Sequence, residues 1–229
     1  MSYKYETHVC YDVIVGSTAH GTATKNSDQD RAGFFLIPTK DFFLLKKTPQ
    51  TSIKRSDGDG CWWEFGHYIN LLLKANPAAL ESLWSPHILR SCKIAKETID
   101  LRDCFLSKTP LLAAYQGVIG SWLGRAKKES QPRKTLSHVY RLSHQIIHLL
   151  QTGQFSIQPS TPEHLEITIK IKTGEISQQE AMELATGMFN SIANEATKSQ
   201  RQPQRDLKPL QDFLYRVRKE NWDTIMISD

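Results

Sequence analysis

The chain has 229 residues, 39% of them hydrophobic and five of them Trp, and its 29 Lys and Arg against 24 Asp and Glu give a formal net charge of +5. This composition is that of an ordinary folded protein with enough apolar surface for a packed core. No run of about 18 apolar residues occurs, and the N-terminal segment lacks the charged-then-apolar pattern of a secretory signal. We therefore expect neither membrane insertion nor export, and a cytoplasmic location.

The first part of the chain predicts short strands joined by loops, because short apolar runs alternate there with turn residues. The predicted strands cover 11–16, 32–38, 42–45 and 61–65. Apolar residues then recur at helical spacing over 66–84, where Asn76-Pro77 ends one helix and begins another.

From about residue 89 onward nearly every periodic segment predicts a helix. These helices cover 89–105, 109–127, 134–152, 162–172, 177–198 and 206–220. Ser177 with Glu180 forms a capping box that begins one helix, and Gly153 ends another. The change of pattern predicts an α+β protein with two domains, 1–88 and an all-helical 89–229.

Two Asp residues lie just before the second predicted strand, a short way downstream of a Gly-Ser pair. Asp28 and Asp30 are two apart, so in an extended segment both carboxylates point to the same side and can hold one divalent cation. Mg²⁺ is usually held by one or two carboxylates together with substrate phosphates. Gly16-Ser17 ends the first predicted strand, and a glycine there lets backbone N–H groups approach a phosphate. The combination predicts a site for a metal-bound nucleotide.

A site with two metal ions normally needs a third carboxylate. The candidates are Asp59 and Glu64, which flank the predicted Cys-Trp-Trp strand, and Asp57, which lies deeper in a Gly-rich turn, is a poorer one. By strand periodicity Asp59 and Glu64 lie on opposite faces, and the sequence leaves open which of them meets the Asp pair.

Positive residues cluster along the chain, for example at 125–128, 133–134 and 216–219. A basic surface of this kind favours a polyanionic partner such as a nucleic acid. The four Cys residues are scattered without a C-x-x-C pair, which favours reduced, mostly buried thiols over a disulfide framework or a zinc site.

The Gly-Ser pair, a spacer and Asp-x-Asp followed by a strand resemble the signature of the DNA polymerase beta superfamily of nucleotidyltransferases. The longer segments GSTAHGTATKNSDQDRAGFFLIP and WEFGHYINLLLKANPAALESLWSP are similar to one branch, the nucleotidyltransferases that accompany RNA ligases in RNA repair in phages and bacteria. The helical segments KTLSHVYRLSHQIIHLLQTGQFSI and HLEITIKIKTGEIS extend this resemblance over about residues 9–180.

The resemblance implies a polymerase-beta-like core of short strands with flanking helices in 1–88, and an active site in the cleft between it and the helical domain. It implies metal ligation by Asp28 and Asp30, with Asp59 as the expected third acid and Glu64 as the alternative. Gly16 and Ser17 are expected to hold phosphate. Contact with the triphosphate or acceptor is implied for one face of a helix, Lys134, His138 and Arg141.

The reaction that we expect is Mg²⁺- or Mn²⁺-dependent transfer of a nucleoside monophosphate from an NTP to a hydroxyl. The resemblance and the basic helical part favour RNA, such as a tRNA-like end, as acceptor, with an RNA ligase as functional partner. Two alternatives remain open: modification of a protein hydroxyl, and a non-catalytic module that binds nucleotides or nucleic acid.

Overall fold

The computed structural model describes residues 8–24, 27–45, 50–54, 60–200 and 206–223. The chain forms two compact units. The first contains 1–19, 25–106 and 205–229, and the second contains 20–24 and 107–204. None of the described helices combines the length and the apolar character needed to span a lipid bilayer.

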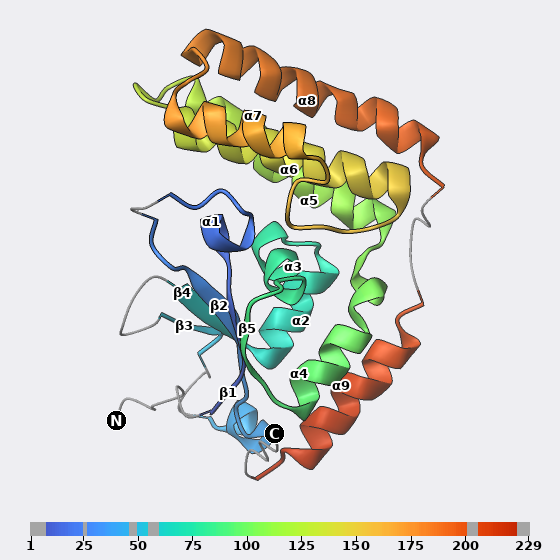
Figure 1. The fold of residues 1–229 in the computed structure, drawn as a ribbon. Helices are drawn as coiled ribbons and strands as arrows, with labels where there is room; N and C mark the ends of the chain where they lie inside the picture. The colour runs from blue at the N-terminus through green and yellow to red at the C-terminus, as the bar shows by residue number, and fades with distance from the viewer. Residues whose placement is uncertain (1–7, 25–26, 46–49, 55–59, 201–205, 224–229) are drawn as a thin grey trace. The chain divides into compact units, whose positions relative to one another are not determined.

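The first unit is built on a five-stranded mixed sheet (Figure 1). Its strands are β1 (Val9–Ile14), β2 (Arg31–Phe35), β3 (Ser52–Lys54), β4 (Gly60–Glu64) and β5 (Ile88–Ser91). They lie in the order β3-β4-β2-β1-β5, with β2 and β4 parallel and the other neighbouring pairs antiparallel. The central strands are apolar along most of their length and are buried, as expected for strands covered on both faces.

Helices pack against this sheet and complete its core. Those of the first unit are α1 (Gly16–Ala19), η2 (Thr39–Phe43), α2 (Phe65–Leu73), α3 (Pro77–Leu83), α4 (Lys93–Asp100), η3 (Arg102–Phe105) and α9 (Lys208–Glu220). The Phe34 ring of β2 lies 5.1 Å from Phe65 and 5.2 Å from Tyr68 of α2, centroid to centroid. Aromatic contacts of this kind bury large areas and fix α2 on the sheet.

The second unit is all-helical. It contains α5 (Lys108–Ala126), α6 (Arg133–Thr152), α7 (Pro162–Thr173) and α8 (Gln178–Lys198). α6 packs against the other three and is buried over most of its length. Ser177 Oγ accepts a hydrogen bond from the Glu180 N–H at 3.2 Å, and Gly153 ends α6 at φ +79°, which confirms both predicted helix ends.

The α+β fold class is confirmed, but two predicted elements are wrong. The segment 42–45 is not a strand, because 3₁₀ helix η2 ends at Phe43 and the side chains of Phe43 and Leu45 are exposed. The expected helix over 89–105 begins instead with β5, whose Ser91 pairs with Tyr11 of β1. Strand β3 was not predicted, since its three residues carry no clear apolar alternation.

The observed division of the chain also differs from the expected boundary at residue 88. β5, α4 and η3 belong to the first unit, because β5 completes the sheet beside β1. α9 returns to the first unit as well, where Phe213 packs edge-on against Phe65 of α2 with centroids 5.9 Å apart. Sequence periodicity identifies such helices but not the unit on which they pack.

Candidate active site

The strand order brings three chain segments together at one end of the sheet. Ile14, the last residue of β1, pairs with Arg31, the first residue of β2, and Arg31 pairs in turn with Gly60, the first residue of β4. The predicted Gly-Ser turn follows β1 and the predicted Asp pair precedes β2. The register therefore places the turn and the Asp-x-Asp segment at the same edge, as required if they form one site.

The contact between this turn and Asp30 is direct. The Val15 N–H donates to the Asp30 carbonyl oxygen at 2.9 Å. Gly16 has a φ of +66°, and a Cβ at that position would overlap the Asp30 carboxylate and lie 3.1 Å from its Cγ. Only glycine suits this position, for its conformation and for its lack of a side chain. The Asp30 carboxylate thus lies against the backbone of the turn.

The Asp residues differ in exposure. Asp28 is exposed and Asp30 is partly buried, and both lie in the segment directly before β2 rather than inside the strand. The Asp30 carboxylate beside Gly16, with Asp28 two residues earlier in the chain, provides oxygen donors of the kind that a Mg²⁺-bound phosphate requires. On donor chemistry, the residues fit the cation that the sequence predicts.

A buried ion pair supports the start of β2. Asp12 of β1 is 3% exposed, and its Oδ1 accepts from Arg31 Nε at 3.1 Å and from Trp62 Nε1 at 3.2 Å. Arg31 also contacts the other Asp12 oxygen. This network ties β1, β2 and β4 together directly next to Asp30. Neither Asp12 nor Arg31 has a predicted role, although a charged residue inside an otherwise apolar strand is a signal that could have found the pair.

The end of β1 is held from its other side. The Ile14 N–H donates to the His87 carbonyl oxygen at 3.0 Å, and Ser85 Oγ donates to the Ile14 carbonyl oxygen at 2.5 Å. Both groups precede β5. The turn at Gly16 therefore follows a strand end that is hydrogen-bonded to β2 and to the segment before β5, which makes it a rigid support.

Asp59, the expected third acid, and Asp57, the poorer candidate, both lie outside the described residues. Gly60, which follows Asp59 in the sequence, pairs with Arg31. Within the described part of the chain, no group of three or more His, Cys, Asp and Glu side chains is arranged to hold a metal ion.

The structure does not bring Glu64 to this edge. Glu64 is the last residue of β4 and pairs with Phe35, roughly 13 Å along the strand from Gly60 at about 3.3 Å per residue. Its Oε2 accepts from the Gly66 and His67 N–H groups at 2.8 and 3.2 Å, which caps α2.

The other Glu64 oxygen, Oε1, accepts from Arg218 Nη2 of α9 at 2.7 Å, and the Glu64 side chain is 4% exposed. The Arg218 guanidinium also lies over the Phe42 ring, 4.7 Å from its centroid. Both Glu64 oxygens therefore have partners that stabilise the fold, and neither is directed to the Gly16 edge.

The three predicted helix residues lie on α6 of the second unit at spacings of four and three. Lys134 is exposed, His138 is partly buried and Arg141 is 4% exposed. The His138 ring contacts Trp122 of α5 with centroids 5.4 Å apart. The shared face expected from the spacing therefore runs from solvent at Lys134 into the interior of the unit at Arg141.

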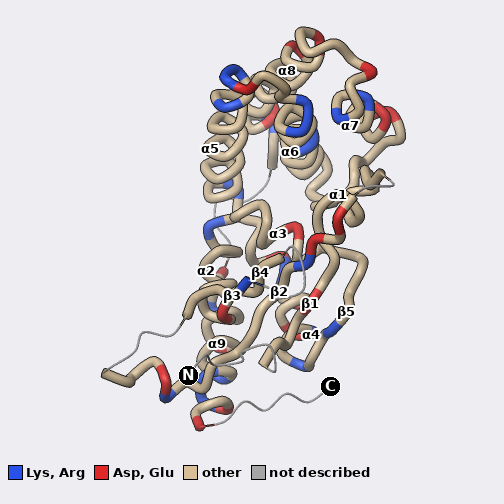
Figure 2. The backbone as a smooth tube through the Cα atoms, turned by 90° about the vertical axis from the view of Figure 1, so that its left-hand side faces the viewer, with Lys and Arg blue, Asp and Glu red and all other residues tan. Residues whose placement is uncertain are grey.

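A cationic region surrounds Lys134. Burial and the nearby Lys134 charge lower the pKa of Lys172 on α7, and the Lys172 ammonium donates to the Thr22 carbonyl oxygen at 2.8 Å. Arg133 of α6 lies beside Gly174, the residue that ends α7. Figure 2 marks further Lys and Arg residues along α5, α6 and α7. Like charges held this close create a positive potential that favours an anion.

The match to a family model is extensive. Residues 1–216 match the model described as the RNA repair pathway DNA polymerase beta family (RlaP). The chain belongs to this family. The match covers both compact units, so the helical unit is part of the family pattern as well as the sheet. A search of the curated proteins gave no match.

Membership of the RNA repair pathway DNA polymerase beta family confirms the resemblance drawn from the sequence. The family name suggests nucleotidyl transfer in RNA repair. The ligand roles of Asp28, Asp30 and Asp59, and the nucleotide contacts of Gly16, Ser17, Lys134, His138 and Arg141, stay predictions.

Proposed function

We propose that this protein is a nucleotidyltransferase that moves a nucleoside monophosphate from an NTP to a hydroxyl at an RNA end. The observation that carries the proposal is the packing of the Asp30 carboxylate against the Gly16 backbone at the edge where β1 ends and β2 begins. A carboxylate and an open backbone turn side by side suit a metal-bound phosphate. Family membership supports the same reaction class.

In this reaction the acceptor oxygen forms a bond to the α-phosphorus, the bond to the bridging oxygen breaks, and pyrophosphate leaves. Asp28 and Asp30 would hold Mg²⁺ or Mn²⁺, which when bound neutralises charge on the phosphate oxygens. Backbone N–H groups of the Gly16-Ser17 turn would hold the phosphates, Gly16 leaves room for the Asp30 carboxylate beside them, and Ser17 adds a hydroxyl donor. Positioning and charge neutralisation supply most of the rate enhancement in phosphoryl transfer.

Asp59 is the proposed third acid and the base that takes the proton of the attacking hydroxyl. The pairing of Gly60 with Arg31 supports this choice, because Gly60 follows Asp59 in the chain and Arg31 follows Asp30. The engagement of Glu64 with α2 and Arg218 argues against the alternative.

RNA is the proposed acceptor because the second unit carries the cationic region around Lys134 and Lys172. Binding of a polyanion reduces the repulsion between these lysines. Such binding weakens as the salt concentration rises. The proposed RNA ligase partner follows from the family setting alone, as an enzyme that would act on the extended end.

The experiment is incubation of the purified chain with each α-labelled NTP, Mg²⁺ or Mn²⁺ and total RNA, beside an Asp28→Ala/Asp30→Ala variant and an Asp212→Ala control. Asp212 is an exposed acid of α9 in an i,i+4 pair with Lys208, so the control removes a carboxylate without touching the site. Label on RNA from the wild type and the control, but not from the double variant or with EDTA, is expected.

Two other outcomes would contradict the proposed transfer to RNA. Label on protein in place of RNA would make a side-chain hydroxyl the acceptor. No label, together with NTP or RNA affinity that survives EDTA and the double substitution, would make the chain a non-catalytic binding module.

A further inference from the structure

Two cysteines of the first unit lie opposite each other across the β1–β5 pair. Tyr11 pairs with Ser91, and one residue further out the Cys92 N–H donates to the Cys10 carbonyl oxygen at 2.9 Å. Residues opposite each other in an antiparallel pair have Cα atoms about 4.5–5.5 Å apart. Disulfides form across Cα separations of about 4.4–6.8 Å. The Cα spacing expected for this pair therefore lies within the range that a disulfide requires.

The two thiols differ in acidity. The neighbouring Cys10 thiol lowers the pKa of Cys92 to about 7, and the amides of Ala95 and Ile94 at the start of α4 favour the same thiolate. The Cys92 side chain and burial raise the pKa of Cys10 far above its ordinary value, and the Cys10 thiol donates to the His8 carbonyl oxygen at 3.7 Å. At neutral pH this arrangement provides one nucleophilic sulfur and one protonated thiol beside it.

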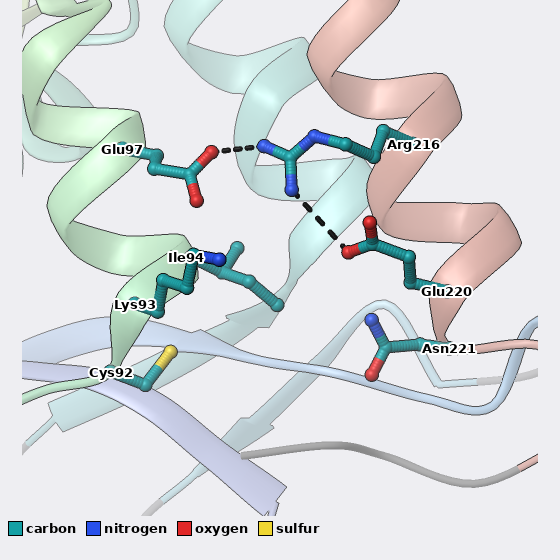
Figure 3. A pocket seen from close by; sticks show the side chains of 7 residues that line it. All are labelled: Cys92, Lys93, Ile94, Glu97, Arg216, Glu220 and Asn221. Atoms are coloured by element: carbon teal, nitrogen blue, oxygen red, sulfur yellow. Dashed lines mark hydrogen bonds and ion pairs between the residues drawn. The ribbon is translucent and has the colours of Figure 1, made fainter. Parts of the chain in front are cut away.

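Small molecules have a route to Cys92. The residue is 2% exposed, yet it forms part of the wall of a pocket of about 280 Å³ between α4 and α9. Figure 3 shows its sulfur directed into this space, below the ion pairs of Arg216 with Glu97 and Glu220. Cys10 is fully buried behind it. A hydroperoxide is small enough to enter a pocket of this size, whereas a protein or a bulky reagent is not.

We propose that Cys92 and Cys10 form a hydroperoxide-sensitive dithiol, with Cys92 as the reacting thiolate and Cys10 as the resolving thiol. The Cys92 sulfur attacks the distal peroxide oxygen, the O–O bond breaks and sulfenic acid forms, with water or an alcohol leaving after protonation. The Cys10 sulfur then attacks the Cys92 sulfur, the S–O bond breaks and water leaves. The peroxide is reduced by two electrons, and the two thiols are oxidised to one disulfide.

The remaining cysteines provide an internal comparison. Cys61 and Cys104 are both more exposed than Cys92. Burial raises the pKa of the Cys61 thiol, which keeps it protonated at neutral pH. If exposure alone decided reactivity, Cys61 and Cys104 would oxidise first. We expect the reverse order, in which Cys92 and Cys10 are oxidised before Cys61 and Cys104.

The test is treatment of the folded, full-length protein with a few equivalents of hydrogen peroxide at pH 7.5. Free thiols are then blocked, and the peptides are mapped by mass spectrometry without reduction. We expect a loss of 2 Da, a peptide cross-linked between Cys10 and Cys92, full alkylation of Cys61 and Cys104, and reversal by dithiothreitol. The same treatment in guanidinium chloride should remove this selectivity, because the pairing exists only in the fold.

Two variants assign the roles. With Cys10→Ala, Cys92 is expected to stop at sulfenic acid, trapped by dimedone, or to proceed to sulfinic acid. With Cys92→Ala, Cys10 should stay reduced, and a Cys61→Ala/Cys104→Ala control should still cross-link. Oxidation that begins at Cys61 or Cys104 in the wild type, or sulfinic acid at Cys92 beside a reduced Cys10, would overturn the proposal. The wild-type map decides this even if a core variant fails to fold.

Discussion

The two ends of the β2–β4 pair carry acidic residues of opposite character. At the end where β2 and β4 begin, Asp28 is exposed and Asp30 lies partly buried against a glycine turn. At the other end Glu64 is 4% exposed in its side chain, caps α2 and pairs with Arg218. Acids that stabilise a fold are buried and fully engaged, whereas acids that receive a ligand need an open side. Residue type alone does not distinguish these two environments, which depend on how the chain folds.

The largest effect should come from Asp30→Asn. This change keeps the shape of the side chain but removes a charge proposed to hold the metal, which is worth several kcal/mol in transition-state stabilisation. We expect nucleotidyl transfer to fall by about 10³-fold, with little change in the thermal midpoint. Transfer rates and thermal unfolding check this, and activity within tenfold of wild type would show that Asp30 is not a ligand.

Glu64→Gln should give the opposite result. The substitution leaves Arg218, whose side chain is 21% exposed, without its carboxylate partner; breaking a fully buried pair costs about 3–5 kcal/mol, so we expect a loss of up to that size. Urea unfolding should show this loss, while transfer per folded molecule stays near that of wild type. Adding Arg218→Met should recover part of the stability. A stable Glu64→Gln protein without activity would reverse the comparison and return Glu64 to the active site.

Gly16→Ala tests the turn, with Gly21→Ala as matched control. Both glycines have positive φ, +66° and +73°, so each substitution should cost roughly 1–2 kcal/mol. A Cβ at Gly16 meets the Asp30 carboxylate, whereas at Gly21 the nearest atom is Leu165 Cδ1 at 3.8 Å. Only Gly16→Ala should therefore also raise the KM for NTP and lower kcat. Equal kinetic effects would mean that the turn acts through stability alone.

The smallest effect concerns the pH dependence of stability and involves His144, a buried histidine of the second unit. His144 of α6 lies 3.8 Å from His164 of α7, ring to ring, and its Nε2 is 3.2 Å from Ser160 Oγ. His148 also lies on α6, one turn further along, and Glu195 of α8 lines the same pocket.

Burial and the charges of His164 and His148 lower the pKa of His144 to about 4. An unfolded His titrates near pH 6.5, so between about pH 6.5 and 4 the unfolded state binds the proton and the folded state does not. Stability should fall by about 1–2 kcal/mol from pH 7 to 5. Urea unfolding at both pH values measures this, and His144→Gln should reduce the change. An unaltered slope in that variant would assign the effect to other groups.

Local sequence patterns were sufficient to predict the family, the α+β class and the bounds of most helices. The residues that begin and end helices give strong local signals: Asn76-Pro77 begins α3, Ser177 caps α8 and Gly153 ends α6. Sequence patterns also predict a site at Gly16, Asp28 and Asp30, because glycine turns and paired acids are unusual beside apolar strands.

Which of these residues meet depends on strand pairing in the folded chain. The pairing of Ile14 with Arg31 and of Arg31 with Gly60 places three segments at one edge, and the same register carries Glu64 to the far end. The tertiary structure also decided that β5 and α9 complete the first unit, and that Cys10 faces Cys92 across more than 80 positions of sequence. Strand register depends on long-range pairing and burial, which no local pattern of residues contains.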